Sequence, residues 1–168
     1  MWWPRAGLTL LLLGLALGLS GCGYQFPART GADLPGGVDR LYLEQVRDTS
    51  GEAGLRGRLR AQFTEEMERR TGAKWVDQEQ SQGLVFLDVE EYQSSTSLED
   101  AAERTIKSEV RIRISARIQD RQSGEQLWDS GSVTGRESFT GQGGEALAER
   151  EALKQAVENL VQRLGQKF

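Results

Sequence analysis

The chain has 168 residues, with 21 lysines and arginines against 25 aspartates and glutamates, no histidine and one cysteine. Without histidine, imidazole-based catalysis and histidine-dependent zinc sites are excluded, and a single cysteine excludes an internal disulfide and a thiolate metal cage. The net charge of −4 argues against a nucleic-acid-binding protein, and the length predicts one domain.

The N-terminus has the pattern of a secretory signal peptide. Arg5 precedes an uncharged, leucine-rich run at residues 6–19, which is shorter than the roughly 20 apolar residues that span a bilayer. Residues 19–22, Leu-Ser-Gly-Cys, resemble the bacterial lipobox, in which the chain is cut before the cysteine and the cysteine is acylated. We therefore expect Cys22 to be a lipid anchor to the membrane. A secreted protein with an incidental free cysteine is the alternative.

The chain is thus predicted to have three parts. Residues 1–21 form the signal peptide, residues 22–37 the lipidated cysteine with a glycine- and proline-containing tether, and residues 38–168 a single α/β domain. By resemblance to enterobacterial sorting, Gly23 rather than aspartate after the cysteine favours the outer membrane, with the domain facing the periplasm.

The domain begins with a predicted strand at residues 38–47 and a turn with helix-capping residues at 48–51. An amphipathic helix follows, because apolar residues recur every four positions until residues 71–72. Its apolar stripe consists of Leu55, Leu59, Phe63 and Met67. We expect the arginines on its other faces to form a solvated surface rather than a binding site.

The clearest strand covers residues 110–119, where apolar residues alternate strictly with polar ones. This alternation predicts one buried and one polar face. A shorter strand is predicted at residues 84–89, followed by a serine-rich loop from residue 94. Residues 127–139 are predicted to return as an antiparallel partner of the clearest strand.

The last predicted strand is weakened by Gly131 and Gly135, which favour a bulge. After a glycine-rich loop at residues 141–144, apolar residues with helical spacing predict a helix to about Lys167. The fold class is therefore α+β, an α/β sandwich with a four-stranded mixed sheet in the order β-α-β-β-β-α. Both helices are expected to pack on one face, leaving the other face wet unless a partner covers it.

No spacing supports an active site. Neighbouring glutamates such as Glu65-Glu66 point to different faces, and residues 141–144 lack the lysine of a phosphate-binding loop. We therefore predict that the protein is not an enzyme and holds no cofactor and no metal.

A row of arginines on the clearest strand is the main candidate for a binding surface. Arg111, Arg113 and Arg117 fall on its polar face, where alternate residues lie about 6.6–6.8 Å apart. They form a candidate partner-contact surface for phosphates or carboxylates. The alternative is pairing within the sheet, and its possible acidic partners are Asp88, Glu90 and Glu137.

Several motifs in order resemble one family. Residues 22–26 read Cys-Gly-Tyr-Gln-Phe, residues 34–38 read Leu-Pro-Gly-Gly-Val, and residues 124–128 read Gly-Glu-Gln-Leu-Trp. Together with the helix at 55–70 and the C-terminal helix, they are similar to the lipopolysaccharide-assembly lipoproteins, LptE.

The resemblance implies a non-enzymatic outer-membrane lipoprotein that sits as a plug inside the β-barrel LptD, helps that barrel assemble and binds lipopolysaccharide during its insertion into the outer leaflet. In the family, basic residues in loops at one end of the sheet are implicated in lipid binding. The candidates here are Arg104, Lys107 and Arg136, although acidic residues stand beside the first two and no basic residue lies at 140–145.

A second class of lipoprotein remains open. Small α/β lipoproteins similar to peptidoglycan-synthase activators or curli secretion proteins also begin with a tethered strand and a helix, and they contact a periplasmic enzyme or secretion assembly. Those activators usually carry a much longer tether than residues 23–37, which span at most about 50 Å at 3.3–3.6 Å per residue. The short tether favours the first class.

Overall fold

The computed structural model describes residues 34–98, 106–141 and 143–166, all within one unit of the chain. The predicted signal peptide, Cys22 and most of the predicted tether lie outside these residues. In chain order the elements are η1 (Pro35–Gly37), β1 (Arg40–Asp48), α2 (Leu55–Thr71), β2 (Lys74–Trp75), η2 (Gln78–Gln80), β3 (Gly83–Leu98), β4 (Ile106–Asp120), β5 (Gln126–Asp129), β6 (Val133–Thr140), α3 (Glu145–Gln162) and η3 (Arg163–Gln166).

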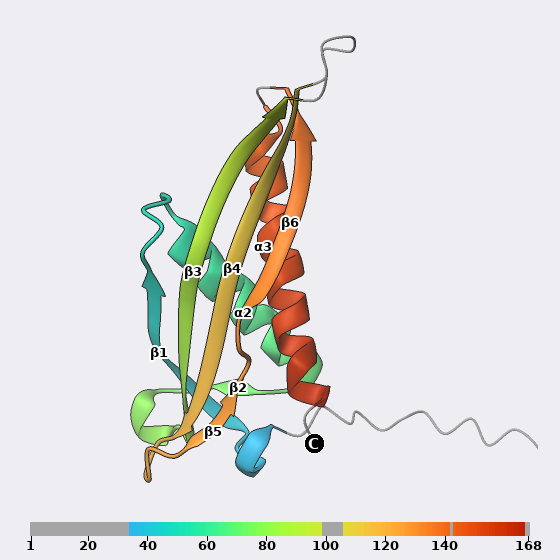
Figure 1. Ribbon diagram of the computed structural model, residues 1–168. Helices are drawn as coiled ribbons and strands as arrows, with labels where there is room; N and C mark the ends of the chain where they lie inside the picture. Colours follow the sequence, from blue (N-terminus) through green and yellow to red (C-terminus); the bar gives the residue numbers. More distant parts are fainter. Residues whose placement is uncertain (1–33, 99–105, 142, 167–168) are drawn as a thin grey trace, which may run out of the picture. The chain divides into compact units, whose positions relative to one another are not determined.

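The described strands form one mixed sheet in the order β2-β1-β3-β4, with β5 and β6 both paired to β4 (Figure 1). β1 and β3 are parallel and are joined through α2, whereas β3–β4 and the β4 pairs with β5 and β6 are antiparallel. The predicted α+β class and the mixed sheet are confirmed. The sheet has six strands, however, where the sequence predicted four.

The two additional strands have different origins. β2 pairs with β1 through only two residues, which is too short to produce a periodic pattern in the sequence. The predicted strand at 127–139 is interrupted at residues 130–132, where Gly131 has a φ of 61° and the register shifts by one residue. Nη1 of Arg163 donates to the carbonyl oxygens of Ser130 and Ser132, at 2.7 and 3.1 Å, and stabilises the break.

The β3–β4 hairpin is longer than the sequence predicted. Residues 94–98, expected as a loop, continue β3 and pair in unbroken register with residues 106–110. The side chains of Ser94 and Ser95 are exposed, so backbone hydrogen bonds rather than burial hold these two residues in the strand. Hydrophobic patterning detects buried strands, and this polar extension therefore gives no signal.

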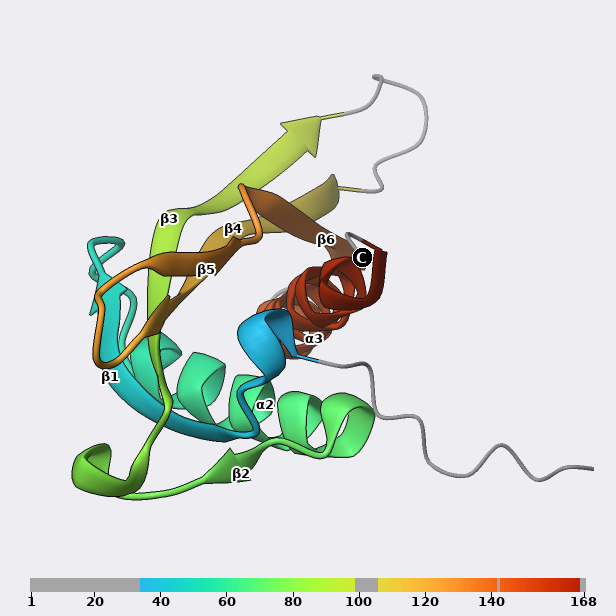
Figure 2. The same cartoon turned by 90° about the horizontal axis from the view of Figure 1, so that it is seen from below.

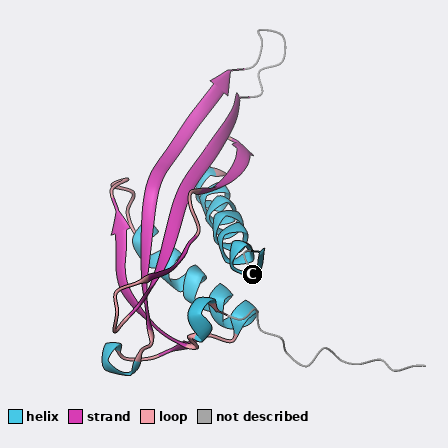
Figure 3. Ribbon diagram, turned by 60° about the horizontal axis from the view of Figure 1, so that its bottom comes forward, coloured by secondary structure: helices cyan, strands magenta, loops and turns pink. Residues whose placement is uncertain are grey.

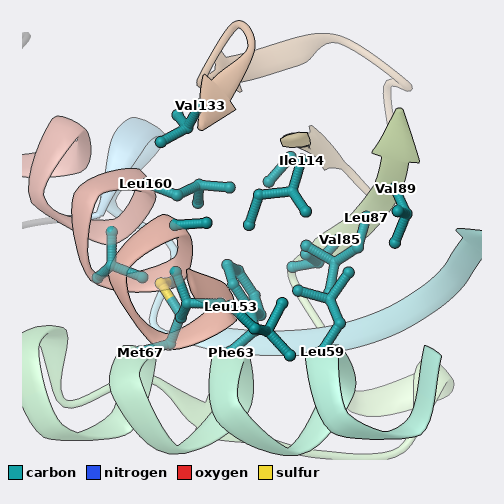
Figure 4. Close-up of a cluster of buried hydrophobic side chains, with 14 of the residues drawn as sticks. Leu59, Phe63, Met67, Val85, Leu87, Val89, Ile114, Val133, Leu153 and Leu160 are labelled. Carbon is teal, nitrogen blue, oxygen red and sulfur yellow. The ribbon is translucent and has the colours of Figure 1, made fainter. Parts of the chain in front are cut away.

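Both helices pack on the same face of the sheet, as predicted, and the sheet curls around them (Figures 2 and 3). Leu59, Phe63 and Met67 of α2 meet Leu153 and Leu160 of α3, and inward-facing residues of β3 and β4 close the core above them (Figure 4). Every residue of the predicted α2 stripe is fully buried. The removal of this apolar surface from water is the main driving force for the fold.

Gly135 does not form the bulge that the sequence suggested. It pairs regularly with Ile112, and α3 crosses β6 at this point so closely that an added Cβ would lie 1.9 Å from the carbonyl oxygen of Ala152. Ala156 is also at the contact and, like Ala152, is fully buried. Small residues on both elements therefore allow the helix to approach the strand.

The folded region extends beyond the predicted domain boundary at residue 38. Leu34 and Pro35 are buried, and Gly36 has a φ of 69° and packs against Leu127 of β5. At the other end, α3 ends at Gln162 and continues as the 3-10 turn η3 instead of running to Lys167.

Candidate functional site

The predicted arginine row exists on the outer face of the sheet. Arg111, Arg113 and Arg117 lie on one face of β4 and are half-buried, whereas Ile112, Ile114 and Ala116 on the other face are fully buried in the core. The strict alternation of β4 therefore predicted the orientation of all three side chains correctly.

At the C-terminal end of the row, the positive charge of Arg117 is compensated by an acidic residue of the sheet. Nη2 of Arg117 lies 3.9 Å from an Asp88 carboxylate oxygen, and its guanidinium stacks 5.3 Å from the centre of the Phe86 ring. Nε of Arg47, on β1, lies 3.5 Å from the same carboxylate. Asp88 was among the predicted partners, whereas the contribution of Arg47 was not anticipated, because it depends on the register of β1 against β3, which shifts between Leu43 and Gln45.

Arg113 pairs with Glu91, a partner that the sequence did not suggest. A bulge at Glu90 shifts the alternation of β3, so that Glu91 lies opposite Arg113 and Tyr92 opposite Ile112. Glu90 instead accepts a hydrogen bond of 2.6 Å from the hydroxyl of Ser132. Without the bulge, Glu90 would occupy the polar face, as the alternation implied.

At the N-terminal end of the row, around Arg111, the positive charges are not compensated in the same way. Arg111 lies directly opposite Arg136 of β6, and Lys107 is four residues along β4 on the same face. Arg111 contacts Glu109 at 3.1 Å, but its Nε is buried without a hydrogen-bond partner among the described residues. The exposed side chains of Lys107 and Arg136 form no ion pair with any described residue. We call Lys107, Arg111 and Arg136 the tip cluster.

The tip cluster is suited to an anion. Like charges directly opposite each other destabilise a sheet, and a phosphate or carboxylate between two guanidinium groups would offset that repulsion. Glu137 was predicted to pair with the arginines of the row. It does not offset this repulsion, because it lies opposite the buried Val110 on the other face of the sheet. Of the predicted site residues, Cys22 and Arg104 lie outside the described residues.

A second charged cluster joins the N-terminal ends of the two helices. Glu149 of α3 is only 9% exposed and forms an ion pair with Arg58 of α2. Burial raises the pKa of the nearby Tyr92 phenol to about 12, and the negative charge of Glu149 adds to this effect. The cluster links α2, α3 and β3, and we interpret it as structural.

The Tyr92 phenol should titrate far above its usual pKa of about 10. The difference in tyrosinate absorbance between the wild type and Tyr92→Phe should have its midpoint near pH 12. Because the folded protein holds this proton more tightly than the unfolded chain, the contribution to stability is complete below pH 10 and is lost as the pH rises toward 12. A midpoint near 10 in the folded protein would contradict the described environment of Tyr92.

The described residues hold no candidate metal centre. They contain no group of three or more acidic or thiol side chains placed to hold a metal ion, and none of their helices is long and apolar enough to cross a membrane. A groove of about 370 Å³ lies between α2 and α3, with Gln62, Glu66 and Lys154 among its lining residues. It contains no predicted site residue.

Comparison with known proteins adds a family and a fold. A model of the family LptE, described as lipopolysaccharide-assembly, matches residues 38–164. No curated protein sequence matches the chain. The solution structure of uncharacterized lipoprotein B from Nitrosomonas europaea is similar over 86% of this chain and 91% of that one, with a TM-score of 0.55 and 15% identity.

Two further structures have lower similarity. Rare lipoprotein B from Shewanella oneidensis is 15% identical, with 76% of this chain and 94% of that chain covered and a TM-score of 0.47. The PelC dodecamer from Paraburkholderia phytofirmans is 10% identical, with 72% and 86% covered and a TM-score of 0.49. At these identities the similarity of the Nitrosomonas structure shows a shared fold and nothing further.

Proposed function

Because the chain belongs to the LptE lipopolysaccharide-assembly family, we propose that it is an outer-membrane lipoprotein that plugs the β-barrel LptD, helps that barrel assemble and assists the insertion of lipopolysaccharide into the outer leaflet. In this proposal the acylated Cys22 anchors a periplasm-facing domain. The role is binding and assembly, without an enzymatic reaction or a cofactor.

The outer face of the sheet supports the plug role. It carries half-buried charged residues and is left uncovered by the two helices, which both pack on the opposite face. A polar face of this kind suits the water-filled lumen of a wide barrel. Arg113 and Arg117 would reach carboxylates of the barrel wall while they keep their own acidic neighbours, as members of a charge network.

The tip cluster carries the lipid-binding part of the proposal. Lipopolysaccharide bears phosphate groups, and guanidinium groups bind phosphate through paired, charge-assisted hydrogen bonds. Arg111 lies opposite Arg136, and the buried Nε of Arg111 has no hydrogen-bond partner among the described residues. A phosphate between the two guanidinium groups would supply the missing acceptor. Arg104, a predicted lipid-binding residue outside the described ranges, would add a further positive charge.

Affinity purification of the lipidated, full-length chain from its native membranes tests the proposal. We expect the tagged wild type to bring down a large outer-membrane barrel together with lipopolysaccharide. Purification without the barrel, or with a peptidoglycan synthase in its place, would contradict the proposed function.

The same preparation tests the lipid site. Arg111→Glu with Arg136→Glu should lower the amount of bound lipopolysaccharide at least about tenfold, since hydrogen bonds to charged groups contribute roughly 1.5–3 kcal/mol each. Arg150→Glu with Lys154→Glu is the matched control, because these residues are exposed on α3 and form no ion pair or side-chain hydrogen bond with any described residue. Equal lipid binding by both double variants would remove the tip cluster from the proposal.

A further inference from the structure

The first two turns of α2 carry an exposed basic surface that the proposed function leaves unused. Arg56 and Arg60 are one helical turn apart and are exposed, and Gly57 and Ala61 lie beside them on the same solvent-facing side. We call these four residues the α2 patch. The sequence predicted only a solvated surface for its arginines.

The α2 patch is electrostatically unfavourable in the isolated protein. Like charges four residues apart on a helix repel each other, and positive charges are unfavourable near the N-terminal end of a helix. The first turn of α2 contains no acidic residue, and the helix has no side-chain N-cap. Arg58 is compensated by Glu149, but the side chains of Arg56 and Arg60 contact no acid among the described residues.

Gly57 adds a second unfavourable feature. Glycine in the interior of a helix is destabilising relative to alanine. An added Cβ at Gly57 would meet no atom within 4 Å, so nothing within the described structure requires a glycine there. With Ala61 one turn further on, the helix backbone is left open to close approach from outside.

The contrast with α3 indicates that the pattern is specific to α2. α3 has Glu145 in its first turn and the buried Glu149 in its second, which is the charge distribution that the helix dipole favours. Local rules of helix stability are broken most often where a sequence serves a function. The arginine pair of the α2 patch breaks them without compensation inside the described structure.

We propose that the α2 patch is a docking surface for an acidic protein surface, whose carboxylates bind Arg56 and Arg60 while its chain packs over Gly57 and Ala61. The choice of occupant rests on the proposed function: the partner is the carboxylate-bearing wall of the barrel. The guanidinium groups alone would also suit lipid phosphates. The small residues Gly57 and Ala61 beside the two arginines favour a closely packed protein, because a headgroup held by two arginines needs no such opening.

Charge reversal in the full-length, lipidated protein tests the proposal. Arg56→Glu with Arg60→Glu should lower the co-purified barrel at least about tenfold, which corresponds to 1.4 kcal/mol or more of binding free energy. The same variant should have an equal or higher thermal midpoint, because it replaces positive by negative charges near the N-terminal end of α2, where the helix dipole favours negative ones. Arg150→Glu with Lys154→Glu, an exposed basic pair with the same spacing on α3, should bind the barrel as the wild type does.

A second variant tests close packing against the α2 patch without changing its charge, and it shows whether a loss of binding comes from unfolding. Gly57→Leu should raise the thermal midpoint, since leucine is a better helix former than glycine, yet lower the amount of co-purified barrel. Three outcomes would contradict parts of this account. Barrel binding at the wild-type level by both α2 variants would overturn the docking surface alone.

Absence of the barrel from the wild-type preparation would overturn the proposed function, and with it the proposal that the barrel wall binds the α2 patch. Loss of binding to anionic phospholipid vesicles, with the barrel retained, would assign the patch to lipid and overturn the proposal.

Discussion

Replacing Gly135 with alanine is expected to destabilise the folded domain by more than about 3 kcal/mol. The new Cβ would lie 1.9 Å from the carbonyl oxygen of Ala152 and 2.8 Å from the amide nitrogen of Ala156. Both atoms belong to the backbone of α3, so no side-chain rotation relieves the overlap and the whole helix must move away from β6. The free energy of unfolding in urea, followed by circular dichroism, measures the loss.

Gly143→Ala is the matched control for this prediction. Its added Cβ would meet nothing within 4 Å, so the unfolding free energy should stay within about 0.5 kcal/mol of the wild type. Proteins are typically stable by only 5–15 kcal/mol, and the Gly135 variant should therefore lose a large share of its stability. A Gly135→Ala protein as stable as the control would show that α3 and β6 do not meet as described.

Replacing Phe63 with alanine should lower the free energy of unfolding by about 3–5 kcal/mol. Phe63 of α2 is fully buried in the core (Figure 4). Its ring meets that of Trp75 edge-on, with the two ring centres 6.1 Å apart. The cavity left behind would be lined by residues of the core. Urea unfolding gives the stability, and tryptophan fluorescence reports the altered surroundings of Trp75.

Leu147→Ala is the control for Phe63→Ala, because Leu147 is a large apolar residue outside the core. It is 55% exposed on α3, so Leu147→Ala should change the unfolding free energy by no more than about 0.5 kcal/mol. If Phe63→Ala were as mild as Leu147→Ala, the central position of Phe63 in the core would be wrong.

The parts of the fold that follow from local pattern could be predicted from the sequence. The alternation of residues 110–119 gave both faces of β4, and the four-residue spacing from Leu55 to Met67 gave the buried stripe of α2. Each of these signals depends on one face of an element being buried, and the burial itself leaves its period in the sequence.

The features that the sequence missed depend on contacts between distant residues or on register. The bulge at Glu90 changes which acid faces Arg113, and no local signal in a run of mixed polar residues marks it. The break between β5 and β6 is held by Arg163, more than 30 residues further along the chain. The candidate site shows the same division, because the orientation of Arg111 was predictable but its position opposite Arg136 required the register of β6.

The β3–β4 hairpin sets a length scale for the molecule. β3 has 16 residues, and at about 3.3 Å per residue such a strand reaches roughly 50 Å when straight. The hydrocarbon core of a bilayer is about 30 Å thick. The β3–β4 ribbon is therefore longer than such a hydrocarbon core is thick, and paired deletions in β3 and β4 would bring its tip closer to its base without changing the residues of the base.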